Sequence, residues 1–357
     1  MLERNIVTPK ELKLIVKHCV THNFPLLIKG KLGSGKTEIS RQGAIEAGIK
    51  PERVIIETPH MKDIPDYTGF AMVYQELDKI RADFIPINTL EKMINATEPT
   101  VFIFDEIDKA KLTMNAIAQI IWGREISNRK IPDCVRFIAT CNLPEEETGS
   151  SLIRPHLLDR FYSVVELRQN EKEWAEYMLC KWGQKALVMV AFIHFRPQYL
   201  LEGQNTDLAM SLKKTPTGRS IENYLKMFLS INAKANPEEK QAMDRLLAGA
   251  MGEEFHIEFQ AFYQLYFSKL PTYEEIVNSP ETAPIPTEDK QISMRYAIIS
   301  MLAGRVDAQT CTAVSRYLLR QEWDAFASLR RVFLEQAKIL HPNLLQTNMV
   351  VDLLSKT

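Results

Sequence analysis

The stretch Gly30-Lys-Leu-Gly-Ser-Gly-Lys36-Thr37 decides the fold, because it fits the phosphate-binding loop pattern with glycines at the required positions. An apolar run at 24–28 precedes this loop, and a helical pattern follows it to about Ala47, with Gly48 as the expected C-cap. A buried strand, a glycine-rich turn and a helix in this order predict an α/β unit whose backbone N–H groups wrap phosphates.

The residues of this loop have separate expected roles. Lys36 is expected to reach the β- and γ-phosphates of ATP, and Thr37 to supply a hydroxyl ligand to Mg²⁺. The start of the following helix adds the positive end of its dipole. The other expected cofactor-binding residues complete the loop: Gly30, Lys31, Leu32, Gly33, Ser34 and Gly35. The alternative interpretation is a tight turn that binds no ligand.

A second motif, Val101-Phe-Ile-Phe-Asp105-Glu106, places two carboxylates directly after four apolar residues. Such acids lie at the carboxyl end of a buried strand, where parallel sheets bind their ligands. Asp105 is expected to hold Mg²⁺ through water, and Glu106 to polarise the water that attacks ATP. Alternatively, the acids only end a strand at the surface. Their combination with a phosphate loop favours ATP hydrolysis.

Further apolar strands are expected at 53–58, 135–141 and 161–167. Strands that alternate with helices over residues 1–167 predict a parallel sheet covered by helices on both faces. The segment 71–85, which Gly69 and Pro86 bracket, is interpreted as a hairpin inserted near a helix. Residues 1–167 are therefore the expected α/β nucleotide-binding core.

Beyond residue 167 the strand patterns stop and helical patterns dominate. Residues 168–267 are expected to form an all-helical lid. Four prolines within 268–290 indicate a linker or an extended crossing, so 268–357 are expected to be a linker and a C-terminal helical module. Helical patterns also place the four tryptophans in the core: Trp122, Trp174, Trp182 and Trp323.

The phosphate loop and the acidic strand together resemble those of AAA+ ATPases, a group of P-loop NTPases, and further residues agree in order and spacing. Asn142, at the end of RFIATCN, is similar to the sensor-1 residue. The segment SLIRPHLLDRF (151–161) resembles the one that ends in the arginine finger, with Arg160 at the matching position and Arg154 as a second candidate. Arg219 resembles the sensor-2 arginine, although Thr-Gly-Arg replaces the more usual Ser-Pro-Arg.

The resemblance implies catalytic roles for these residues. Asn142 would orient the attacking water, and Arg160 would neutralise charge on the phosphoryl group bound by a neighbouring subunit. Other interpretations are open: Asn142 caps a turn, and Arg219 is a solvated residue in the first turn of a helix. Arg160, in the same way, would pair with Asp159 or Glu166 on its own surface.

Three stretches resemble the MoxR branch of AAA+ proteins: IPDYTGF (64–70), FIPI (84–87) and NLPEEETGSSLIRPHLLDRF (142–161). The resemblance covers about residues 20–235. It implies a ring, expected to be a hexamer, that remodels or loads a protein client, and the partner in this branch often carries a von Willebrand factor A domain. Tyr67 and Phe70 lie where AAA+ unfoldases carry an aromatic pore loop, or else they pack beneath the hairpin.

Composition and charge exclude several classes of protein. A chain of 357 residues that is 45% hydrophobic and 25% charged is globular and not mostly disordered. Its net charge is −1 and neither half is basic, so strong binding to a nucleic-acid backbone is not favoured. A DNA-directed AAA+ ATPase, such as a helicase or loader component, is the alternative function. A third is a nucleotide-gated switch, which has no need of Glu106.

The remaining residue types indicate no further cofactor. The five cysteines lack zinc-site spacing and are interpreted as reduced, mostly buried thiols, and the seven histidines lack metal-ligand spacing as well. The longest apolar run, 186–193, is far short of the ~18 residues that span a bilayer. The first residues contain no signal-peptide core. We therefore expect a cytoplasmic protein without a membrane partner.

Overall fold

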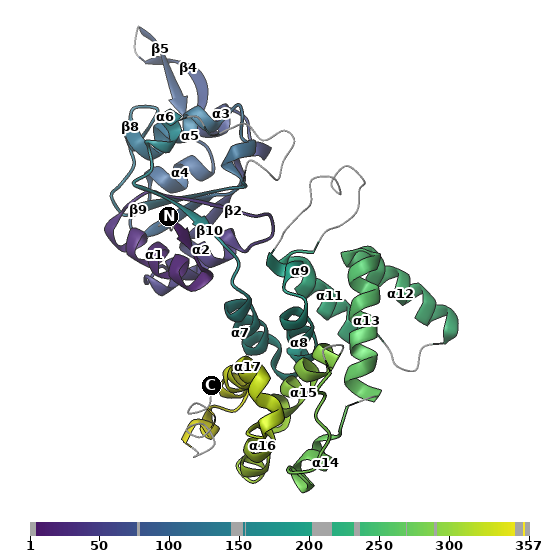
Figure 1. Cartoon of the computed structure of the whole chain (residues 1–357). Coiled ribbons are helices and arrows are strands. Elements are labelled where there is room, and N and C mark those ends of the chain that lie inside the picture. The colour runs from purple at the N-terminus through teal and green to yellow at the C-terminus, as the bar shows by residue number, and fades with distance from the viewer. Residues whose placement is uncertain are drawn as a thin grey trace. The chain divides into compact units, whose positions relative to one another are not determined.

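The computed structural model describes residues 5–76, 79–143, 153, 155–201, 216–231, 236–268, 270–288, 291–346 and 353. The chain divides into two compact units, Met1–Gln169 and Asn170–Thr357 (Figure 1). The first unit contains the strands, and the described part of the second is helical.

A six-stranded parallel sheet forms the centre of the first unit. From one edge to the other its strands are β1 (Ile6–Val7), β10 (Ser163–Leu167), β2 (Leu26–Gly30), β9 (Val135–Cys141), β6 (Thr100–Phe104) and β3 (Val54–Glu57). The five expected strands are all present within two residues of their predicted bounds. The sequence did not indicate β1, because two residues are too short to show a period.

Helices cover both faces of this sheet, so the predicted fold class is confirmed. Helices α1 (Pro9–His22) and α2 (Lys36–Glu46) share one core with Leu26, Ile28 and Ile103. Helices α4 (Thr89–Ile94) and α5 (Met114–Gly123) share another with Leu27 and Phe102. Successive strand residues point to opposite faces, which explains why these strands are apolar throughout.

The inserted hairpin is present and consists of β4 (Phe70–Glu76) and β5 (Lys79–Ile85), paired antiparallel. It follows the short helix α3 (Pro65–Thr68) and projects from the rest of the first unit (Figure 1). A second, smaller antiparallel pair joins β7 (Glu125–Ile126) to β8 (Arg129–Lys130). Several apolar side chains of the hairpin are exposed, among them Val73 (69%) and Ile80 (80%).

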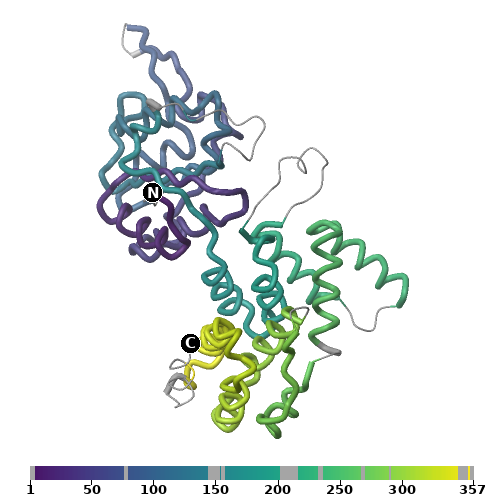
Figure 2. The backbone as a smooth tube through the Cα atoms, viewed as in Figure 1, coloured from purple at the N-terminus to yellow at the C-terminus, as the bar shows by residue number. Residues whose placement is uncertain are grey.

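The second unit has two hydrophobic clusters within one bundle, and its path runs from teal to yellow in Figure 2. Helix α15 contributes Ala297 to the first cluster and Ile298 to the second, so it joins them. The helices are α7 (Glu171–Trp182), α8 (Leu187–Phe195), α9 (Gln198–Leu201), α11 (Gly218–Ser230), α12 (Pro237–Met251), α13 (Glu253–Ser268), α14 (Tyr273–Asn278), α15 (Ile292–Arg305), α16 (Cys311–Leu318) and α17 (Ala327–Leu340).

The proline-rich segment is more ordered than a free linker. It contains α14, whose Tyr273 and Ile276 are buried in the second cluster. Tyr317 Oη donates to the Pro284 carbonyl at 2.7 Å and Arg295 Nε to the Pro286 carbonyl at 2.7 Å, so side chains of the bundle bind the extended part. Within the described residues, none of the helices combines the length and apolar character that crossing a bilayer requires.

One tryptophan contradicts the expected core. Trp323 and Trp174 are buried and Trp182 packs against a core cluster, but Trp122 is 57% exposed. Trp122 stands in the last turn of α5, which ends at Gly123, whereas Ile117 earlier in the helix is buried on the sheet. In the same turn Ile120 and Ile121 are buried, so Trp122 lies on the side of α5 that faces away from the core, and the apolar period alone does not show how far around the helix the buried face extends.

Close packing of α1 on α2 leads to a stability prediction. A Cβ at Gly43 of α2 would lie 2.7 Å from a methyl carbon of Val16 and 3.0 Å from the Lys13 carbonyl oxygen. Gly43→Ala should therefore lower the free energy of unfolding by about 1–3 kcal/mol through overpacking, although alanine favours helices. Gly249→Ala is the control, because a Cβ at Gly249 in α12 meets nothing within 4 Å.

Urea unfolding followed by circular dichroism measures both effects. Gly249→Ala should leave the midpoint unchanged or raise it by the equivalent of up to about 1 kcal/mol. A Gly43→Ala protein as stable as the control would show that the two helices can separate without cost.

Candidate functional site

The phosphate loop connects β2 to α2 and depends on two glycines with positive φ. Gly33 has φ +68° and Gly35 has φ +90°, both in the left-handed region that side chains disfavour. Gly35 is the N-cap of α2 and makes no side-chain cap, so the first N–H groups of this helix are left for a ligand. The backbone therefore has the geometry that the motif predicts.

Lys36 is the first residue of α2, and its side chain turns back under the loop. Only 7% of the residue is exposed, and its Nζ donates to the carbonyls of Gly30 (2.7 Å) and Lys31 (2.8 Å) and to Asn142 Oδ1 (3.1 Å). These three acceptors are neutral. An anionic phosphate oxygen is a stronger acceptor for an ammonium group, so a nucleotide phosphate can compete for Nζ.

Asp105 and Thr37 lie in direct contact. Thr37 Oγ1 donates to Asp105 Oδ1 at 2.7 Å, and Thr140 Oγ1 donates to the same oxygen. A hydroxyl and a carboxylate side by side, next to a phosphate loop, are the oxygen donors that Mg²⁺ takes in nucleotide sites, with water and phosphate completing its shell. The residues present thus fit the metal that the motif implies.

Glu106 has an unusual backbone conformation, with φ +55°. A left-handed conformation in a residue other than glycine costs energy, and such residues cluster at functional sites, although Asn23 and Arg124 adopt it here as helix C-caps. The turn is fixed by the Glu106 N–H, which donates to Thr140 Oγ1 at 3.2 Å. The carboxylate is partly exposed and forms ion pairs with Lys109 (3.2 Å) and with His60 (3.7 Å) when that histidine is protonated.

Asn142 completes the group from the end of β9. It is 6% exposed, its side chain contacts Lys36, and its backbone N–H donates to Asp108 Oδ1 at 3.3 Å. The structure therefore brings together the phosphate loop, Asp105, Glu106 and Asn142. They meet because β2, β9 and β6 are adjacent and parallel, so their carboxyl ends share one edge of the sheet.

Two polar residues at this edge carry no motif and were missed by sequence reasoning. Gln169 follows β10 and donates from Nε2 to the Ser34 carbonyl at 2.8 Å, which supports the phosphate loop from the side. Glu57 ends β3, and its carbonyl accepts the Asp105 N–H at 2.8 Å. Their roles depend on strand neighbours distant in sequence, so no local signal identifies them.

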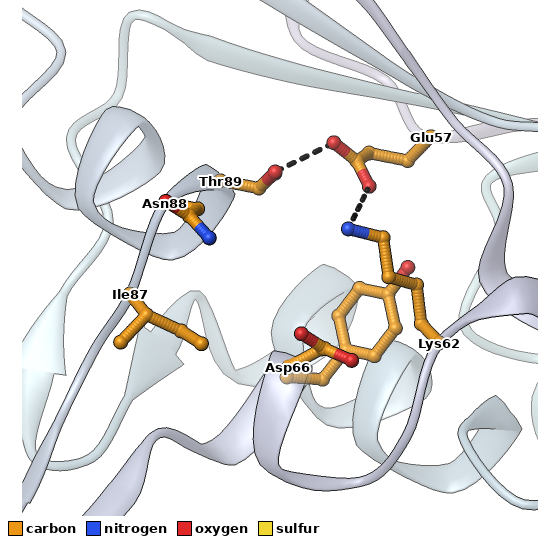
Figure 3. A pocket seen from close by; sticks show the side chains of 7 residues that line it. Glu57, Lys62, Asp66, Ile87, Asn88 and Thr89 are labelled. Carbon is orange, nitrogen blue, oxygen red and sulfur yellow. Dashed lines mark hydrogen bonds and ion pairs between the residues drawn. The ribbon is translucent and has the colours of Figure 1, made fainter.

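The Glu57 carboxylate faces a small pocket at the base of the hairpin (Figure 3). It accepts a hydrogen bond from Thr89 Oγ1 at 2.6 Å and lies 3.9 Å from Lys62 Nζ. Burial raises the pKa of the neighbouring Tyr67, and the charges of Glu57 and Asp66 raise it further. Thr89 follows the hairpin and Lys62 precedes it, so this carboxylate connects both ends of the insertion to the carboxyl end of β3.

Tyr67 and Phe70 have different environments. Tyr67 is 3% exposed and contacts Phe104 edge-on, with ring centroids 6.3 Å apart. Phe70 begins the hairpin and is 54% exposed. Tyr67 therefore packs in the core beside β6, and of these two residues only Phe70 presents its ring to solvent.

Arg160 lies near the amino ends of the strands, whereas the phosphate loop of the same chain lies at their carboxyl ends. It precedes β10, which is parallel to β2 with Ser163 beside Leu26 and Leu167 beside Gly30. Five residues of strand, about 16 Å, therefore separate Arg160 from the loop. Glu166 pairs with Arg168 instead, and the described residues give Arg160 no ion pair. Its guanidinium lies over the Trp122 ring, 5.0 Å from the centroid.

The structure does not test the roles predicted for the other two arginines, Arg154 and Arg219. Arg154 lies outside the described residues. Arg219 is exposed in the first turn of α11, after a capping box formed by Thr217 and Ser220, and belongs to the second unit. The role of Arg219 as a phosphate ligand stays a prediction.

No protein-family model and no curated protein matches the chain. Among solved structures, a RuvB mutant from Thermotoga maritima is 12% identical, with 72% of this chain and 74% of that chain covered and a TM-score of 0.39. NtrX from Brucella abortus in complex with ADP is 14% identical, with 94% and 67% covered and a TM-score of 0.35. The extended S. cerevisiae Hsp104–casein complex is 17% identical, with 74% and 45% covered and a TM-score of 0.35. At these values the activity has to be argued from the site itself.

The cysteine beside Asn142 gives a chemical test of the site. Burial raises the pKa of Cys141 to about 12, and the charge of Asp108 adds to the shift. At pH 8 about 10⁻⁴ of this thiol is ionised, and the thiolate is the form that reacts. Iodoacetamide should therefore leave Cys141 unmodified in the native protein while it modifies the exposed Cys180.

Mass spectrometry of the peptides, with a urea-unfolded sample as the control, measures both cysteines. Rapid modification of Cys141 in the native protein would mean that the end of β9 is open to solvent and that Asn142 is not buried.

Proposed function

We propose that this protein is a Mg²⁺-dependent AAA+ ATPase. The observation that carries the proposal is the convergence of Lys36, Asp105, Glu106 and Asn142 from three adjacent strands at one edge of the sheet. Each side chain has the chemistry that phosphoryl transfer to water needs. The resemblance of the motifs to AAA+ proteins supports the same class.

In this mechanism the protein binds and orients, and water carries out the attack. The loop N–H groups and Lys36 bind the β- and γ-phosphates, while Thr37 and Asp105 are the residues that would hold Mg²⁺. When bound, the ion neutralises phosphate charge. Glu106 accepts a proton from the attacking water, for which its carboxylate has to leave Lys109. Asn142, next to Lys36, orients that water.

The position of Arg160 supports hydrolysis between subunits. An arginine at the amino edge of the sheet has no route to its own phosphate loop at the carboxyl edge. In a ring it would face the nucleotide of a neighbour and neutralise charge in the transition state. We propose a ring, expected to be a hexamer, in which assembly and ATP hydrolysis are coupled.

For the cellular role, we propose remodelling or loading of a protein client, as in the MoxR branch. The support is the sequence resemblance, together with a projecting hairpin that exposes apolar side chains beside the catalytic edge. A von Willebrand factor A protein is the expected partner. The near-neutral charge of the chain gives no specific support to a DNA-directed ATPase.

Two substitutions separate binding from hydrolysis. Lys36→Ala should abolish ATP binding, because this ammonium contacts the ground-state phosphates. Glu106→Gln should keep ATP binding while kcat falls by about 10²–10⁴-fold, because this carboxylate acts on water alone. Fluorescent-nucleotide binding and phosphate release measure the two properties. Normal hydrolysis by Glu106→Gln would remove Glu106 from the mechanism.

Mixing variants tests the role of Arg160 across the interface. Arg160→Ala should lower kcat by about 10³–10⁵-fold and change nucleotide binding little. Arg160→Ala subunits keep a working pocket and Lys36→Ala subunits keep the finger, so mixed rings should regain activity that neither parent has. Native mass spectrometry is the control for mixing. Mixed rings that stay inactive would exclude catalysis in trans by Arg160.

A further inference from the structure

Trp122 and Arg160 form a contact that the site described so far does not use. Trp122 lies in the last turn of α5 and is 57% exposed, whereas the other large apolar residues of that helix, such as Ile117 and Ile121, are buried. The Arg160 guanidinium lies 5.0 Å from the centre of its ring. This is within the ~6 Å range of a cation–π interaction.

Ring contacts recur among the described arginines, for example Arg196 over Phe195 at 4.3 Å, but Arg160 differs from Arg196 in having no ion pair beside its ring contact. Arg53, Arg196 and Arg331 each pair with a carboxylate, at distances of 2.8–3.1 Å. The structure gives Arg160 no such partner among the described residues, although Asp159 is its neighbour in sequence and exposed. A tryptophan ring therefore takes the place of an acid.

The difference matters for an arginine that has to meet a phosphate. A carboxylate neutralises the guanidinium and has to be displaced, whereas an aromatic face orients the planar group and leaves its charge and its N–H donors unused. An exposed cation–π contact favours the bound position by a factor of only about two to five, and a charge-assisted arginine–phosphate bond is stronger. Release from the ring therefore presents a small barrier.

We propose that Trp122 is the positioning residue of the arginine finger. It holds the Arg160 side chain extended and uncompensated at the amino edge of the sheet, ready for the γ-phosphate of a nucleotide bound by a second copy of this chain. The inference rests on the proposed function. It adds that the finger is pre-oriented by its own subunit, so fewer rotamers are lost when the subunits meet.

Kinetics on the unaltered protein and four variants test the proposal. Trp122→Ala should lower kcat by about 3–10-fold and leave KM for ATP nearly unchanged, and Trp122→Phe, which keeps an aromatic face, should recover most of the loss. In an Arg160→Ala background, Trp122→Ala should have no further effect, because it acts only through Arg160. The proposal would be overturned if Trp122→Ala lowered kcat equally in the otherwise unaltered protein and in Arg160→Ala, or if it caused no loss in the otherwise unaltered protein.

Tyr162→Ala is the matched control. Tyr162 is an aromatic residue two positions from Arg160 with 67% exposure, and it stacks on Phe24 at 5.3 Å. If the loss of any exposed aromatic ring near Arg160 lowers kcat non-specifically, Tyr162→Ala should lower kcat too, and it should do so also in the Arg160→Ala background. A Tyr162→Ala effect that also vanishes there would mean that the whole edge, and not Trp122, positions the finger.

Fluorescence supplies a readout that does not depend on turnover. The difference in emission between the unaltered protein and Trp122→Phe isolates Trp122, and it should change when a non-hydrolysable ATP analogue drives assembly. That change should be absent in Arg160→Ala rings of the same mass. If Arg160→Ala is fully active, the finger assignment fails; if it is inactive while Trp122 gives no coupling, only the present inference fails.

Discussion

The buried ammonium of Lys36 is the charge on which the catalytic edge depends. A buried charge is costly unless hydrogen bonds surround it, and Lys36 meets this need with two loop carbonyls and Asn142. The same bonds tie the phosphate loop to the end of β9. The loop therefore has its shape without a nucleotide, and in the proposed function phosphate oxygens would compete with these three neutral acceptors for the ammonium.

The sheet order determines everything else at this edge. Strand β9 lies between β2 and β6, so its Thr140 and Asn142 connect the loop to the acidic pair. Parallel strands place Arg160 at the far edge, where its partner is an exposed ring and not an acid. The fold thus separates the proposed phosphate-binding loop from the arginine that is proposed to complete catalysis, and for this reason the proposed mechanism needs a second subunit.

The sequence by itself determined the features that depend on neighbours within a few positions. The phosphate loop needs glycines and a lysine at fixed spacing, and the acids end an apolar strand. The strands of the sheet and the inserted hairpin were predictable for the same reason. A β-strand of two residues, such as β1, carries too little pattern to be found.

Only the tertiary structure decided the contacts between segments far apart in the chain. It placed Gln169 under Ser34, joined Glu57 to Thr89, and exposed Trp122 to meet Arg160. A helical period shows that one face is apolar, but it does not show how far around the helix the buried face extends: Ile121 is buried and the next residue, Trp122, is exposed. Such contacts follow from strand order and from the length of each packed element, and both are set by the folding of the whole unit.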